Sequence, residues 1–213
     1  MLKTASTLAL VPAALLVALL SASPARAQLN RTFVSGVGSD TNPCSLDSPC
    51  RTFQTAFNAT SAGGEIDVLN PADYGPLTIT NAVSIEGHGY ALIDAANSPT
   101  AIEINAGEKD TINLSGLIIE GNGTGGTAIT YNSGQLLTIK DCVIQDFASH
   151  GILIVPSTSS RFWILDTVVS NVSEGINVGP TRSAVVSGSI TRVRVYNNNH
   201  YGILVYGTYT KTQ

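Results

Sequence analysis

The sequence contains little charge, few aromatic side chains and few cysteines. Only 12% of its 213 residues are charged and 6% are aromatic, and there are three cysteines and one tryptophan. The formal net charge is −4 and no patch of Lys and Arg occurs, which makes nucleic acid a poor partner. After residue 20 no second apolar run of membrane length follows, so no membrane span is expected in the processed chain.

The first 27 residues have the pattern of a bacterial export signal. Lys3 precedes an apolar run at 8–20, and Ala25-Arg26-Ala27 forms a small-x-small cleavage site. The apolar run is too short to span a bilayer, which disfavours a membrane anchor. We therefore predict cleavage after Ala27, a secreted or periplasmic location, and a mature chain of 28–213.

The cysteines fall into a close pair and a single residue. Cys44 and Cys50 bracket the short loop "CSLDSPC", which in an exported protein predicts a local disulfide. A metal site at this pair is disfavoured, because no further Cys or His lies nearby at ligand spacing. Cys142 falls at an inward position, where we expect a small buried side chain with an inert thiol.

A repeat of about 25 residues decides the predicted fold. Gly-Ile-x-Ile/Val recurs at 151–154, 175–178 and 202–205, and three columns of apolar residues keep the same period. These columns are Ile104, Ile129, Ile154, Val178 and Val205; Leu114, Ile139, Ile164 and Ile190; and Ile119, Ile144, Val169 and Val195. Each repeat therefore has three short strands with side chains alternating between core and solvent. This predicts an all-β, right-handed parallel β-helix of about five coils. An antiparallel sandwich is the alternative, but it would not keep three columns in phase.

The region before the repeats has a different pattern. We interpret 65–68, 77–79 and 83–85 as the three strands of the first coil. Before them, Ser48 is the expected N-cap and Pro49 the first residue of a short helix, whose apolar face is Phe53, Ala56 and Phe57. We predict a cap over 28–64, formed by the disulfide loop and this helix, at the N-terminal end of a β-helix spanning 65–213.

These segments carry a resemblance to a known superfamily. "RTFVSG" at 31–36, "PCRTFQTAF" at 49–57, "GGEIDVL" at 63–69 and "VSIEG" at 83–87 resemble secreted bacterial right-handed β-helix repeat proteins of the pectin lyase-like superfamily. The resemblance covers most of 31–205. It implies the fold but no single activity, because that fold hosts lyases, hydrolases, epimerases, phage tailspikes and adhesins.

Gly87-His88-Gly89 is a tripeptide that also occurs in the active sites of polygalacturonases. In each coil, however, the residue two past the last apolar position of the third strand is a type that tolerates left-handed backbone angles. This column is Gly87, Gly121, Asp146, Asn171 and Asn197. We favour a repeated turn, with His88 as the next loop residue. The Asn-Thr-Asp, Asp-Asp and Arg-x-Lys motifs of polygalacturonases are also missing.

A second polar column, Gly116, Asp141, Asp166 and Arg192, is the catalytic candidate. On rungs about 4.8 Å apart, Asp141 and Asp166 could bind Ca²⁺ or share a proton, and Arg192 could act as the base of an elimination reaction. The alternative, which we favour, is a polar corner with a surface ion pair between Asp166 and Arg192. No dense acidic cluster supports calcium or another cofactor. His150 and His200 are expected about 10 Å apart, so no metal site is predicted.

The aromatic residues supply the candidate ligand-binding surface. Trp163 is expected to point outward, and Tyr131, Tyr196 and Tyr201 fall at strand ends or outward positions. Exposed aromatic faces stack on sugar rings, so these four residues are candidates for binding a polysaccharide. Packing against outward neighbours is the alternative interpretation.

The predicted function is binding of extracellular or cell-surface polysaccharide without a recognisable catalytic site. One alternative is a polysaccharide lyase or glycoside hydrolase acting on an acidic, pectin-like glycan, and another is a structural or adhesin-like surface protein. The last strand, at 201–205, opens a new coil with no capping helix after it. We therefore expect end-to-end self-association or a missing C-terminal segment.

Overall fold

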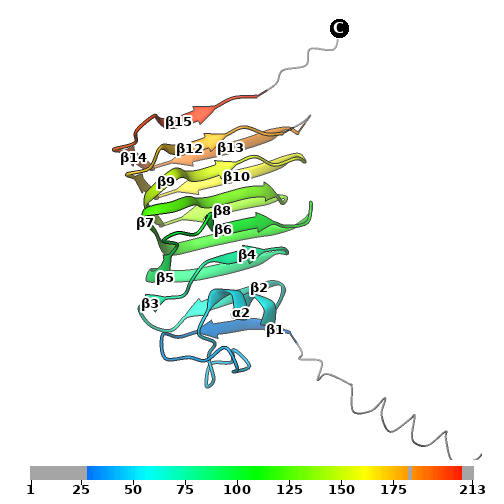
Figure 1. The fold of residues 1–213 in the computed structure, drawn as a ribbon. Coiled ribbons are helices and arrows are strands. Elements are labelled where there is room, and N and C mark those ends of the chain that lie inside the picture. The colour runs from blue at the N-terminus through cyan, green and yellow to red at the C-terminus, as the bar shows by residue number, and fades with distance from the viewer. Residues whose placement is uncertain (1–27, 182–183, 208–213) are drawn as a thin grey trace, which may run out of the picture.

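The chain folds into a parallel β-solenoid of about five turns with about 25 residues per turn. The computed structural model describes residues 28–181 and 184–207. The expected export signal at 1–27 lies outside the described residues. Fifteen strands and one short helix, α2 (Phe53–Ala59), stack along a single axis, as Figure 1 shows. The predicted all-β solenoid is confirmed.

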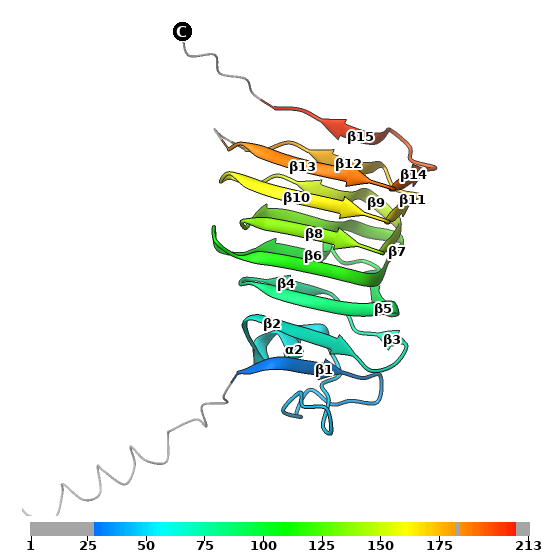
Figure 2. The same cartoon turned by 180° about the vertical axis from the view of Figure 1, so that it is seen from behind.

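Each turn of the solenoid contributes to three faces. The first face, in front in Figure 2, contains β1 (Leu29–Val34), β2 (Thr60–Val68), β8 (Leu136–Lys140), β10 (Ser160–Leu165) and β13 (Val186–Thr191). The second contains β3 (Ala72–Asp73), β11 (Val168–Ser170) and β14 (Arg194–Tyr196). The third contains β4 (Leu77–Ile79), β6 (Thr100–Asn105), β12 (Glu174–Val178) and β15 (Tyr201–Val205). Three long strands, β5 (Val83–Asp94), β7 (Thr111–Ser133) and β9 (Val143–Ile154), turn corners and serve more than one face.

The apolar columns fill the interior of the solenoid. On the first face, Leu114, Ile139 and Ile164 pair in register with one another, and Ile190 follows. On the second face, Ile119, Ile144, Val169 and Val195 pair in the same way, as the sequence predicts. Apart from Ile190 and Val195 in the last turn, these side chains are buried. Stacking of identical column positions therefore provides one continuous core along the axis.

The third-face column differs from the prediction at one position. Ile104 pairs with Tyr131, not with Ile129, and Tyr131 pairs with Ile154. Ile129 belongs to the neighbouring inward column, between Ile102 and Ile152. Both columns are buried, so a uniform step along the sequence could not distinguish them.

The strands before residue 100 also lie on other faces of the solenoid than the predicted order of strands implies. Residues 65–67 pair with 84–86 on the first face, so 83–85 opens a new turn and does not complete the first. The second face of the first turn is the two-residue strand β3, which is too short to show an alternating pattern. Residues 77–79 pair with 102–104 on the third face.

The predicted disulfide loop and short helix are both present, but β1 (Leu29–Val34) and the start of β2 already belong to the sheet, so the solenoid does not begin at residue 65 as predicted. Cys44 and Cys50 form the disulfide, and Phe53, Ala56 and Phe57 of α2 are buried. The N-cap is Thr52, whose side chain accepts from the backbone N–H of Thr55, and not Ser48 as predicted. Residue 50 cannot be helical, because its N–H donates to the carbonyl of Phe33 and its carbonyl accepts from Ser35 along β1.

The opposite end of the described stack is open. Within 28–181 and 184–207, β13, β14 and β15 each pair with a strand on one side only. Ile203 is 49% exposed and Val205 is 70% exposed, although their partners Ile176 and Val178 are buried. Val205 is thus not solvent-inaccessible, because no further rung among the described residues lies over it.

Candidate functional site

The catalytic candidates lie at the corner where the chain passes from the first face to the second, here called corner 1. From the turn of β5 onward, each turn has a residue in a left-handed backbone conformation there: His88, Gly116, Asp141, Asp166 and Arg192, with φ between 50° and 62°. Gly and Asp tolerate this conformation best, which explains most of the column without catalysis.

Each carboxylate at corner 1 has its own cation. Arg192 Nε and Nη2 donate to the two oxygens of Asp166 at 2.5 and 2.7 Å, and Lys140 Nζ lies 3.4 Å from Asp141 Oδ2. The hydrogen bonds from Arg192 lower the pKa of Asp166, and Asp166 in turn raises the pKa of Arg192. The arrangement is a surface ion pair beside a second, looser one. Arg192 would have to leave Asp166 before it could act on a ligand.

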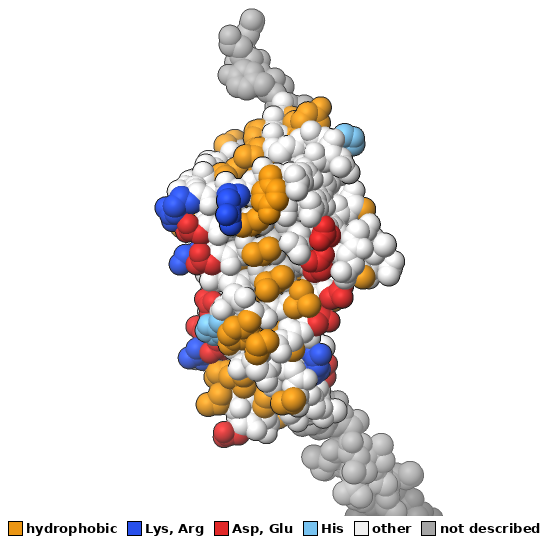
Figure 3. Space-filling model, turned by 90° about the vertical axis from the view of Figure 1, so that its left-hand side faces the viewer, with side chains coloured by type: hydrophobic (Ala, Val, Ile, Leu, Met, Phe, Trp, Pro, Cys, Tyr) orange, Lys and Arg blue, Asp and Glu red, His pale blue; other side chains and the backbone are white. Residues whose placement is uncertain are grey.

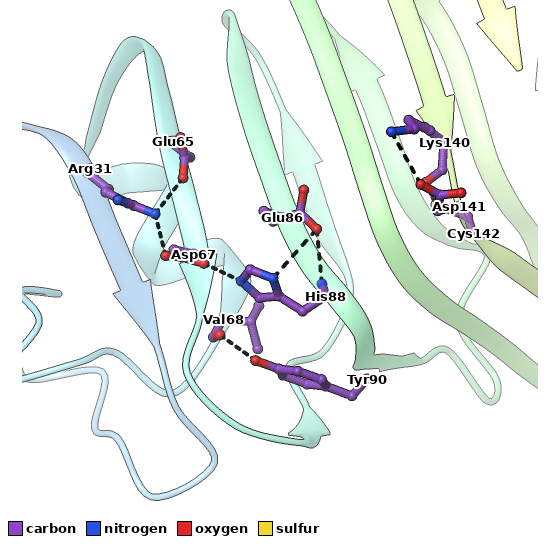
Figure 4. A network of polar contacts seen from close by, with 10 residues as sticks. All are labelled: Arg31, Glu65, Asp67, Val68, Glu86, His88, Tyr90, Lys140, Asp141 and Cys142. Atoms are coloured by element: carbon purple, nitrogen blue, oxygen red, sulfur yellow. Dashed lines mark hydrogen bonds and ion pairs between the residues drawn. The ribbon is translucent and has the colours of Figure 1, made fainter. Parts of the chain in front are cut away.

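His88 belongs to a third polar group at corner 1, shown in Figure 4. Its Nε2 lies 2.6 Å from Asp67 Oδ1, and Asp67 Oδ2 accepts from Arg31 at 2.5 Å. Glu86 accepts from the backbone N–H of His88 at 3.1 Å, and the imidazole stacks on Tyr90 at 5.6 Å between ring centroids. The ring is thus held by its neighbours on two adjacent turns, which supports the turn interpretation.

The left-handed residues of the Gly-His-Gly tripeptide are His88, with φ of 55°, and Gly89, with φ of 79°, and not Gly87 as predicted. Gly87 is needed for a different reason. A Cβ at this position would lie 2.5 Å from the carbonyl oxygen of Gly116 and 2.7 Å from Leu117 Cδ2. Glycine therefore permits the close approach of two turns, and the tripeptide lies at corner 1, not at the end of a third strand.

The second corner, between the second and third faces, carries polar groups that the sequence did not single out. Its left-handed residues include Asn122, Asp146, Asn171 and Asn197, so Asn122 takes the position predicted for Gly121. Burial raises the pKa of Glu120, and a side-chain hydrogen bond and charge from Asp146 raise it further. Asp146 therefore lies close enough to Glu120 to disfavour the ionised form of that carboxyl group.

The two histidines at the second corner have separate partners. His150 Nδ1 lies 2.7 Å from Ser149 Oγ, and its Nε2 lies 3.4 Å from Glu174 Oε2. His200 Nδ1 lies 2.9 Å from Ser173 Oγ. Among the described residues, no group of three or more His, Cys, Asp or Glu side chains could hold a metal ion.

The predicted ligand-binding aromatics divide into three exposed residues and one buried residue. Trp163 is 44% exposed on the first face, Tyr196 is 49% exposed on the second, and Tyr201 is 54% exposed on the third. They therefore do not form one platform. Tyr131 is fully buried, so the outward orientation predicted for it is wrong. The step from Ile104 to its partner in the next turn is 27 residues (131 − 104) and not 25, which places Tyr131 in the inward column instead.

A polar pocket of about 380 Å³ opens on the first face, on the same strand as Trp163. It is lined by Glu108, Gln135, Ser159, Ser160, Arg161, Val185 and Ser187. Arg161 has no ion pair among the described residues, unlike Arg192. Arg161 was not among the predicted site residues. It lies two residues before Trp163 in β10, so the alternation of the strand places both side chains on the outward side.

Figure 3 shows the second face, with a band of hydrophobic side chains between charged ones. Leu92, Ile118, Val143 and Val168 lie in register along this face and are half-buried. Inside the corner, Cys142 is buried, and burial raises the pKa of its thiol to about 12, as expected for an inert cysteine.

No family model, curated protein or solved structure matches this chain. Within the described parts of the chain, no helix has the length and apolar character needed to cross a membrane.

Proposed function

We propose that this chain is an exported β-solenoid that binds extracellular or cell-surface polysaccharide on its first face without cleaving it. The observation that carries the proposal is the exposed Trp163 in the middle of a polar row. Its indole stands 44% exposed on β10, and its in-register neighbours are the small polar residues Thr138 and Ser189.

The row continues along the solenoid axis below Trp163. Thr138 pairs with Asn113, and Asn113 with Ser84, and the amide of Asn113 donates to the hydroxyl of Ser84 at 3.1 Å. Rungs repeat at about 4.8 Å, which is close to the length of one pyranose unit. A linear glycan lying along the axis would therefore present one sugar to each rung, with hydroxyl and amide partners below and one ring over the indole.

Binding without cleavage is favoured over a lyase or hydrolase by the state of the acidic residues. Asp141 and Asp166 are each next to a cation, and both lie at corner 1, away from the outward row of the first face. A hydrolase needs a pair of carboxyl groups flanking the scissile bond. The exposed row around Trp163 offers hydroxyl and amide groups, which suit recognition.

The export signal expected at 1–27 and the resemblance to secreted bacterial β-helix repeat proteins support a secreted or periplasmic location for this binding. A purely structural or adhesin-like role is the second candidate. The apolar band on the second face favours it, because such a band suits contact with another surface.

A glycan array probed with residues 28–213 tests the proposal. We expect binding to one or more polysaccharides, lost in Trp163→Ala and kept in Tyr201→Ala, which removes a somewhat more exposed aromatic ring from the third face. Reducing-sugar and unsaturated-uronate assays on the same glycans should show no product. Release of product would establish the enzyme alternative, and binding unaffected by Trp163→Ala would place the ligand elsewhere.

A further inference from the structure

The pocket on the first face contains a cation without a counter-ion. Arg161 lines the pocket of about 380 Å³, and its side chain makes no hydrogen bond or ion pair among the described residues. Two other exposed arginines are engaged: Arg31 with Glu65 and Asp67, and Arg192 with Asp166. A guanidinium is a planar donor that matches the geometry of carboxylate and sulfate groups.

Arg161 and Trp163 are positioned to contact one ligand. They are separated by one residue in β10, so their side chains point to the same, outward side, about 6.6 Å apart along the strand. The strand is fixed on both sides, by β8 and by β13, over its whole length. The spacing between the two side chains is therefore set by the backbone and does not depend on a mobile loop.

The other pocket residues define the polarity of the site. Ser160 is 5% exposed, and its single hydroxyl hydrogen is already engaged, with the carbonyl of Gly134 at 2.7 Å and that of Thr158 at 3.0 Å as acceptors. Gln135 and Glu108 offer acceptors for sugar hydroxyls, and Glu108 would repel a second negative charge. The pocket thus suits one anionic group at Arg161 surrounded by hydroxyl groups. The pocket of about 260 Å³ on the third face has Glu103 in its lining and no cation.

We infer that Arg161 binds the anionic substituent, a carboxylate or a sulfate, of a sugar residue whose neighbour stacks on Trp163. This inference rests on the proposed function and adds the charge class of the ligand to it. The site selects acidic or sulfated polysaccharides over the neutral chain of the same backbone. The preference for the anionic chain comes from charge-assisted hydrogen bonds that the guanidinium donates at two points. Loss of these hydrogen bonds should weaken binding of the anionic chain about tenfold or more.

The test uses one β-glucan oligosaccharide in three forms, namely neutral, oxidised to the uronate, and sulfated, together with the full glycan array. Binding to residues 28–213 is measured by calorimetry for the wild type, Arg161→Gln, Arg161→Lys, Trp163→Ala and Arg194→Gln. Arg194 is the matched control, because it is another exposed arginine without an ion pair among the described residues, but it lies on the second face. Both glutamine variants therefore have the same net charge.

We expect an anionic form to bind at least tenfold more tightly than the neutral form, with this preference removed by Arg161→Gln and kept by Arg194→Gln. Arg161→Lys should recover part of it, and salt should weaken binding of the anionic form only where Arg161 is present. Comparison of the two anionic forms shows whether carboxylate or sulfate is the better ligand. Equal losses in Arg161→Gln and Arg194→Gln would mean nonspecific charge attraction and would overturn the inference.

Failure of this inference is distinguishable from failure of the proposed function. If neutral and anionic forms bind equally and only Trp163→Ala weakens them, the polysaccharide function stands and the role of Arg161 is refuted. If the wild type binds none of the forms and nothing on the array, both are refuted.

Discussion

Replacing Ile154 by alanine tests the inward register that defines the solenoid. Ile154 is fully buried on the third face, between Tyr131 and Val178 in adjacent turns. Removal of buried isoleucine atoms costs about 2–5 kcal/mol, and the cost is highest where the surroundings cannot collapse into the cavity. Backbone ladders on both sides hold these rungs about 4.8 Å apart, so we expect the upper half of that range. For a domain of this size, this corresponds to a fall in Tm of roughly 6–20 °C.

The matched control is Leu153→Ala, which shortens the preceding side chain of the same strand. Leu153 points outward and is half-buried, so its truncation removes less area from water and leaves no internal cavity. We expect less than half of the destabilisation seen for Ile154→Ala in calorimetric unfolding. If Leu153→Ala is as damaging as Ile154→Ala, or if Ile154→Ala melts like the wild type, the assignment of inward and outward positions is refuted.

The remaining predictions concern titration, metal binding and the open end. Cys142, with a pKa raised to about 12 by burial, should resist iodoacetamide in the native protein and react once urea unfolds it; native-state alkylation would contradict its placement. The hydrogen bonds from Arg192 lower the pKa of Asp166 below its ordinary value of 3.8. The ion pair therefore stabilises the fold fully at pH values above 3.8. This stabilisation is lost as the pH falls through the lower pKa of the folded state. Asp166→Asn should therefore lower Tm at neutral pH relative to the wild type, and this difference should disappear in acid; a difference that disappears near neutrality instead would argue against the pair. Calcium titration by calorimetry should detect no micromolar site, whereas one abolished by Asp141→Asn would revive the lyase alternative. Residues 190–205 should exchange amide hydrogens faster than 114–139, or become protected as protein concentration rises through self-association; concentration-independent protection would mean that the last turn is covered within one molecule.

The fold could be predicted from the sequence because the inward residues recur with the period of the solenoid turns. Most inward positions are apolar and most turns repeat a corner of the same length, so Leu114, Ile139 and Ile164 recur in step. The prediction became unreliable where a turn departs from the period. The two-residue strand β3 is too short to show an alternating pattern. The corner between Glu86 and Ala91 contains four residues and is longer than the same corner in the next turn.

The candidate site was less predictable than the fold. Trp163 was placed correctly, because alternation along β10 fixes which side chains face solvent. Tyr131 was misplaced because a shift of two residues leaves both candidates, Ile129 and Tyr131, pointing inward. Arg161 was not singled out at all, since sequence does not show which cations find a partner.

The sequence by itself determined the period, the faces of the strands after residue 100, the disulfide and the buried face of the short helix. These are local or strictly periodic properties, and each follows from residues that are close in sequence or repeated at a constant interval. Only the tertiary structure decided which side chains from different turns meet. His88 contacts Asp67, and Asp166 pairs with Arg192. Arg161 has no ion pair among the described residues, although it lines the same pocket as Glu108. Such pairings depend on lateral register between rungs to within a few ångströms, and a one-dimensional pattern does not specify that distance.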